Sequence, residues 1–157
     1  MVGARLHFPA LCRFSDTLIR LVVGPSQDLS EEQQDIVNEM LARQLQVYME
    51  YHSISTAELE RLGGLIEHME SVYNVTRVAV NVGSLKIVLH CSSLESLERL
   101  WSDCLSGHLN EVAEGFLVTD EMKRKLKLET VRLKTTLEEE NYLLCKQALM
   151  KMSGKFY

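Results

Sequence analysis

Between Val78 and Leu89, apolar and polar residues alternate on both sides of a Gly83-Ser84 dipeptide. A two-residue loop that begins with glycine is typical of a type I′ or II′ turn, which joins two antiparallel strands directly. With this loop, the apolar positions of one strand fall opposite those of the other and form one apolar face. The predicted cross-strand pairs are Val82–Leu85, Val80–Ile87 and Val78–Leu89. The pattern therefore predicts a β-hairpin whose apolar face needs a cover of helices.

Two further segments have the pattern of strands. Residues 17–23 are β-rich and apolar on both faces, and the segment stops at Gly24-Pro25. That pattern is typical of an inner strand. Residues 130–137 alternate and are rich in β-branched side chains, which predicts another strand. Residues 1–16 fit either a short strand or an irregular lead-in, because Pro9 disfavours a central strand there.

Helical spacing of apolar residues and N-capping signals predict the remaining elements. Capping boxes at Ser30–Gln33 and Ser55–Glu58 open two helices, the first of which should end near His52. The Gly63-Gly64 pair in the second helix indicates either close packing against the sheet or the preceding helix, or a hinge. Later helical segments are expected from Ser92-Ser93 to Gly107, over residues 109–117, from Thr119-Asp120 past Leu126, and from Glu138 to Met152.

The predicted order is strand, long helical segment, β-hairpin, helical segment, strand and helix. This is the order of a ferredoxin-like sandwich, whose first and third strands are central. We therefore expect an α+β fold: a ferredoxin-like two-layer sandwich with a four-stranded antiparallel sheet packed against helices, and extra helices added. With 157 residues the chain is expected to form a single domain, residues 1–157, around its own core. An exposed sheet edge, at residues 77–82 or 132–137, invites self-association.

Composition narrows the class of partner. The chain is 46% hydrophobic and 25% charged, which is typical of a globular protein. Its formal net charge is −5 and it has no run of five Lys or Arg residues, which disfavours nucleic acid and anionic membranes as partners. The sequence shows no apolar stretch long enough to span a bilayer and no signal-peptide pattern at its N-terminus. We therefore expect a cytoplasmic protein.

The residues that could act as nucleophiles or metal ligands are scattered along the chain. Cys12, Cys91, Cys104 and Cys145 form no disulfide or metal-binding spacing, and we expect reduced, mostly buried thiols. The histidines are isolated along the chain: His7, His52, His68, His90 and His108. His90 and Cys91 are adjacent in a strand and so point to opposite faces, which excludes a nucleophilic pair. Cys104 and His108 are four residues apart and could share a helix face. No further ligands accompany them, so the pair does not predict a metal site.

No phosphate-binding, metalloprotease or hydrolase motif is present, so we expect no enzyme, no catalytic residue, no cofactor and no metal. Two charged clusters remain. Glu138–Glu140 suit the first turn of a helix, although they also suit a cation or a basic partner. Lys123, Arg124, Lys125 and Lys127 fit either an acidic partner or an exposed helix end. Aliphatic residues in the predicted central strands argue against RNA recognition through the sheet.

Four segments resemble a known family in their order and spacing. They are Gly83–Cys91 in the second hairpin strand, Leu94–Asn110 in the helix that follows, Leu133–Leu137 in the last strand, and Tyr142–Lys146 in the closing helix. Together they resemble the TRADD-type N-terminal domains, found in a death-domain adaptor of tumour-necrosis-factor receptors and in invertebrate immune and death-signalling proteins. The resemblance covers about residues 55–150 and implies a ferredoxin-like fold.

The resemblance implies a non-enzymatic adaptor domain for protein–protein interaction in intracellular immune or apoptotic signalling. In TRADD the domain docks on the TRAF domain of a trimeric adaptor, partly through aromatic residues of the first strand. The expected partner is therefore a signalling protein, either a TRAF-type adaptor or a second copy of the chain. Residues 18–23 contain no aromatic side chain and residues 30–52 have no counterpart, so no partner-binding residue is assigned. The alternative is a ligand-sensing regulatory domain that dimerises and binds a small metabolite.

Overall fold

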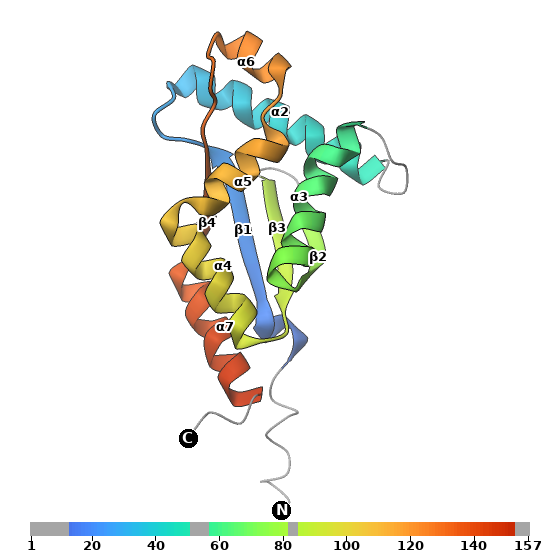
Figure 1. Ribbon diagram of the computed structural model, residues 1–157, viewed down its shortest axis with the longest axis vertical. Coiled ribbons are helices and arrows are strands. Elements are labelled where there is room, and N and C mark those ends of the chain that lie inside the picture. Colours follow the sequence, from blue (N-terminus) through green and yellow to red (C-terminus); the bar gives the residue numbers. More distant parts are fainter. Residues whose placement is uncertain (1–12, 51–56, 82–84, 153–157) are drawn as a thin grey trace, which may run out of the picture.

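The structure, a computed structural model, describes residues 13–50, 57–81 and 85–152 (Figure 1). A 3₁₀ turn, η2, precedes the first strand. The elements in chain order are η2 (Phe14–Thr17), β1 (Leu18–Pro25), α2 (Glu31–Glu50), α3 (Ala57–Tyr73), β2 (Val75–Asn81), β3 (Leu85–Cys91), α4 (Leu94–Ser106), α5 (His108–Leu117), α6 (Asp120–Leu126), β4 (Leu133–Leu137) and α7 (Glu139–Met152).

The four strands form one antiparallel sheet in the order β2-β3-β1-β4. β1 and β3 are central, as predicted, and Leu21 of β1 pairs with Ile87 of β3 on one side and Leu137 of β4 on the other. Leu21 and Ile87 are at most 1% exposed, because helices cover this face of the sheet (Figure 1). The α+β sandwich with additional helices is therefore confirmed.

The hairpin register is only partly as predicted. Val80 pairs with Ile87, but Leu89 pairs with Arg77, so the predicted Val78–Leu89 pair is wrong. A β-bulge lies between Arg77 and Ala79 and leaves Val78 38% exposed. Val75 and Val80 both turn toward the core yet are an odd number of residues apart, so one extra residue is needed to keep both inward. The predicted Val82–Leu85 pair involves residues 82–84, outside the described residues.

Helix boundaries follow the local signals. The reciprocal capping box is present at the start of α2, where Ser30 N–H donates to Gln33 and Gln33 N–H donates to the Ser30 hydroxyl. Gly107 adopts a φ of 88° between α4 and α5, which is the predicted interruption. The predicted capping box at residues 55–58 and the predicted end of the first helix near His52 fall on or beside residues 51–56, which are not described. β1 extends to Pro25, two residues further than the pattern predicted.

Side chains of helices pair with backbone groups of the sheet that neighbouring strands leave unpaired. At the start of β1, beyond the reach of the short β4, Arg20 N–H donates to Asn141 Oδ1 at 2.9 Å. The Asn141 Nδ2 amide donates to the Leu18 carbonyl at 3.0 Å. One amide of α7 thereby supplies the donor and the acceptor that a neighbouring strand would supply.

The outer edge of β4 is closed in the same way by α5. Thr135 N–H and its hydroxyl both donate to Asn110 Oδ1 at 2.7 Å, and Leu133 N–H donates to Glu114 Oε2 at 3.0 Å. The edge at residues 132–137 is therefore not free for strand addition, although its pattern predicted an exposed edge. At the opposite edge, Arg77 N–H donates to Glu70 of α3 at 3.1 Å beside the bulge.

We expect Asn141→Ala to lower the free energy of unfolding by about 1–3 kcal/mol, because two backbone groups of β1 lose their partners. Urea denaturation measures the change. Gln147→Ala, an exposed position of α7, is the matched control and should change stability by less than about 0.5 kcal/mol. Equal stability of the two variants would contradict a closing role for Asn141.

The paired glycines of α3 allow close helix contacts, which supports the packing interpretation. A Cβ atom at Gly64 would lie 3.0 Å from the Phe116 ring of α5, whereas at Gly63 it would lie 3.8 Å from Tyr48 of α2. Gly115 of α5 has open space at the Cβ position. A Cβ atom at position 64 would force the Phe116 ring to shift by a few tenths of an ångström, and the helix contacted there, α5, is neither the sheet nor the preceding helix that the pattern predicted.

Alanine substitutions at helical glycines should separate packing from helix propensity. Gly115→Ala should stabilise the protein by about 0.5–1 kcal/mol, because alanine is the better helix former. Gly64→Ala should lose that gain and be less stable than Gly115→Ala by about 1–3 kcal/mol, owing to the contact with Phe116. Thermal melts of the two variants would test this order, and an equal gain for both would show that Phe116 moves away freely.

Candidate binding surfaces and their supporting contacts

His90 and Cys91 point to opposite faces of β3, as predicted. Cys91 is fully buried in the core, whereas His90 lies on the outer face and stacks on Phe14 with ring centroids 4.3 Å apart. Burial lowers the pKa of His90. A stacked imidazole on one face and a buried thiol on the other cannot act as a nucleophile and base.

Cys104 and Cys145 also have structural surroundings, whereas Cys12 lies outside the described residues. Cys91 and Cys145 of α7 are both buried, and a hydrogen bond between the two thiols raises the pKa of Cys91 and lowers that of Cys145. Cys104 lies 3.7 Å from the Thr135 carbonyl oxygen, to which its thiol donates, and burial raises its pKa. His108 is exposed at the start of α5. In the described part of the chain, no three His, Cys, Asp or Glu side chains are grouped so as to hold a metal ion.

A polar and aromatic cluster joins α4 to α7. The Tyr142 ring stacks on Trp101 with centroids 4.2 Å apart and planes 6° apart. The Tyr142 hydroxyl donates to Glu98, and Lys146 lies 3.0 Å from the same carboxylate. Burial alone would raise the pKa of Glu98, but hydrogen bonds from Tyr142 and Lys146 outweigh it and lower the pKa. These contacts hold the last helix, α7, against α4.

A second pair of this kind joins α3 to α4. The hydroxyl of the fully buried Tyr73 donates to Asp103 at 2.6 Å, and Arg99 lies over the Tyr73 ring at 5.6 Å. Burial and the neighbouring carboxylate raise the pKa of Tyr73. The neutral phenol is thereby fixed as a hydrogen-bond donor inside the structure.

The four strands contribute no carboxylate to the outer face of the sheet. None of the four strands contains Asp or Glu, whereas Arg20, Lys86 and Lys134 alternate with core residues and so project from the outer face. Val22 and Val88 lie between these cations. β1 therefore presents aliphatic and basic side chains rather than aromatic ones on this face.

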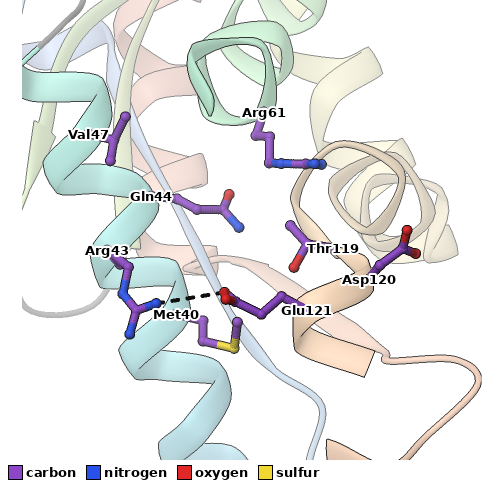
Figure 2. A pocket seen from close by; sticks show the side chains of 8 residues that line it. All are labelled: Met40, Arg43, Gln44, Val47, Arg61, Thr119, Asp120 and Glu121. Atoms are coloured by element: carbon purple, nitrogen blue, oxygen red, sulfur yellow. Dashed lines mark ion pairs between the residues drawn. The ribbon is translucent and has the colours of Figure 1, made fainter. Parts of the chain in front are cut away.

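A cleft of about 480 Å³ lies between α2, α3 and the start of α6 (Figure 2). Arg43 pairs with Glu121 at 3.7 Å, and Gln44 Nε2 donates to the Leu117 carbonyl at 2.8 Å. Gln44 Oε1 is buried without a partner among the described atoms, and Arg61 extends into the cleft. The lining residues are Met40, Arg43, Gln44, Val47, Arg61, Thr119, Asp120 and Glu121. Two cations and two carboxylates line the cleft, so its charge favours neither anionic nor cationic ligands.

The two charged clusters named from the sequence are both at the surface. Glu138–Glu140 are exposed at the start of α7, and Lys123, Arg124, Lys125 and Lys127 lie on α6 and at its C-terminal cap. Large apolar side chains are also exposed, on several elements. They are Phe14, Met49, Val78, Leu105, Leu143, Leu144 and Met152. In the described residues, no helix is long and apolar enough to cross a membrane.

Comparison with known families supports the resemblance. Residues 59–122 match the model of the TRADD-like N-terminal domain, a stretch that includes most of α3, the strands β2 and β3, and α4 and α5. The chain therefore resembles that family in its central part. The predicted matches in Leu133–Leu137 and Tyr142–Lys146 lie outside this stretch and stay predictions.

Curated relatives cover a similar share of the chain. The death effector domain-containing protein of Homo sapiens is 31% identical over 71 residues, which is 45% of this chain and 22% of that protein. The proteins of the same name from Mus musculus and Rattus norvegicus match to the same extent. The match thus spans about a fifth of the length of these relatives. No solved structure matches the chain.

The contacts of Glu98 predict a pH dependence of stability. Because the folded state lowers the pKa of Glu98, its stabilising contribution is present at neutral pH and is lost as pH falls through that pKa. Glu98→Gln should therefore be less stable than the wild-type protein at pH near 7, and the difference should shrink under acid conditions. Urea denaturation at both pH values measures it. A difference that stays constant would show that the charge of Glu98 does not stabilise the fold.

Proposed function

We propose that this chain is a non-enzymatic adaptor domain that binds other proteins in intracellular immune or apoptotic signalling. The observation that carries the proposal is the match of residues 59–122 to the TRADD-like N-terminal domain. The death effector domain-containing relatives support the same signalling context by their name. We further propose a cytoplasmic location and a single folding unit for residues 1–157.

The side chains support a protein-binding role rather than a catalytic one. Titratable groups with shifted pKa values, such as Tyr73, Cys91 and Glu98, are used to join helices to each other or to the sheet. An adaptor needs a fixed framework that presents surface side chains, and these buried contacts provide one. A TRAF-type adaptor and a second copy of the chain are the two partners that the family resemblance favours.

A metabolite-sensing domain is the second candidate. The unpartnered Gln44 Oε1 and the nearby Arg61 in the cleft between α2 and α3 are the observations that favour it. The mixed charge of that cleft makes it less selective than a site built for one ligand, so we place this candidate second.

Purified chain, mixed with purified TRAF-domain trimers, should form a complex of higher mass by size-exclusion chromatography with light scattering. If the chain is instead its own partner, its mass alone should increase with concentration. An unrelated ferredoxin-like domain of similar charge is the control. Affinity capture from cells should recover identified death-signalling or immune-signalling proteins. Recovery of none of these, together with thermal stabilisation by a metabolite that requires Arg61, would overturn the adaptor proposal in favour of the second candidate.

A further inference from the structure

Two of the buried cysteines lie together although they are far apart in the sequence. Cys91 is the last residue of β3 and Cys145 lies in α7, and both side chains are fully buried in the core. A hydrogen bond joins their thiols. The third cysteine of the described residues is Cys104, whose thiol donates to the Thr135 carbonyl. The structure thus pairs two of the three described thiols and engages the third elsewhere.

The backbone contacts around this pair place both cysteines at the same end of the sheet. His90 pairs with Leu18 at the start of β1, so the next residue, Cys91, lies level with the residue before Leu18. The Asn141 amide of α7 donates to the Leu18 carbonyl at 3.0 Å. Cys145 follows Asn141 by four residues and so lies on the same face of α7. Figure 1 shows α7, in red, beside the end of the sheet where β1 begins and β3 ends.

This arrangement favours a disulfide. An S–S bond is about 2.0 Å long, and two thiols in hydrogen-bond contact have only a short approach to make. The contacts of Asn141 with β1 and of Tyr142 with Glu98 already hold α7 in place, so the fold aligns the two sulfur atoms before any bond forms. A thiol is a weak donor and a weak acceptor, so the hydrogen bond between two thiols adds little to the stability of the core.

We propose that Cys91 and Cys145 are a redox-modification site, which a hydroperoxide oxidises to a disulfide that locks α7 to β3. The Cys145 thiol first takes one oxygen atom from the hydroperoxide and becomes a sulfenic acid, and an alcohol is released, or water if the oxidant is hydrogen peroxide. The Cys91 sulfur then attacks the Cys145 sulfur, and the hydroxyl group leaves with the Cys91 proton as water. The pair loses two electrons and two protons, and a thiol reductant reverses the reaction by exchange.

Burial sets the conditions of this reaction. Both thiols are covered in the native packing, so the hydroperoxide reaches Cys145 when α7 opens locally from the sheet. The disulfide closes a loop over residues 91–145, which restricts the unfolded chain and stabilises the fold. The site goes beyond the proposed adaptor function and does not depend on it, because oxidation changes how firmly α7 is attached whichever partner the domain binds.

The test treats the full chain with hydrogen peroxide under native conditions, at low protein concentration, and then blocks the remaining thiols with an alkylating reagent. Mass spectrometry of a protease digest, without reduction, identifies the linked peptides. We expect a peptide that joins Cys91 to Cys145 as the main linked product in the monomeric protein. Its formation should raise the melting temperature by about 5–15 °C, and dithiothreitol should reverse the shift.

Cysteine variants assign the shift in melting temperature to this pair. Cys145→Ala should abolish the rise that peroxide causes, whereas the matched control Cys104→Ala should retain it. Circular dichroism reports whether each variant is folded. Oxidation of the wild-type chain in urea is a second control, in which the cysteines should form mixed pairs because the fold no longer aligns Cys91 with Cys145.

Three results would overturn the proposal. In the first, both thiols stay open to alkylation after peroxide treatment or are oxidised separately to sulfinic acids. In the second, the main link involves Cys12 or Cys104. In the third, the link between Cys91 and Cys145 forms with the same yield in urea as in the folded protein. Because the assay contains no partner protein, each of these results leaves the adaptor function unaffected.

Discussion

Strand β1 is the element on which the rest of the structure depends. It pairs with β3 along one edge and with β4 along part of the other, and its core-facing residues Ile19, Leu21 and Val23 are at most 1% exposed. A central strand must have every backbone group paired, because an unpaired buried group costs stability. β4 is too short to pair with residues 18–20, and Asn141 of α7 supplies the missing donor and acceptor. The position of the last helix is thus tied to the first strand.

The same requirement explains why helices are attached to the sheet through polar side chains. Asn110 and Glu114 close the outer edge of β4, and Glu70 contacts the bulged edge of β2. Closing these edges disfavours sheet extension at β4 as a mode of binding. It leaves side chains rather than the β4 edge as the exposed groups at this side of the sheet, and the four strands contain no Asp or Glu.

Sequence patterns were sufficient for the architecture but only partly for the register. Alternation around Gly83-Ser84 placed Val80 opposite Ile87, and the apolar residues of 17–23 placed β1 in the centre, both in agreement with the structure. The Val78–Leu89 pair was wrong because a bulge is a response to two inward positions set by tertiary packing, Val75 and Val80. The roles of Asn110 and Asn141 had no signal in the sequence, since an asparagine in a helix is most often simply solvated.

The sequence by itself determined the order of elements, the strands that are central, and the absence of a nucleophilic pair at His90 and Cys91, because periods of two and 3.6 residues decide which side chains share a face. Only the tertiary structure decided that helix side chains pair with the edge of β4 and that Glu98, Tyr142 and Lys146 join two helices. These depend on distances between segments far apart in the chain, which no local pattern encodes.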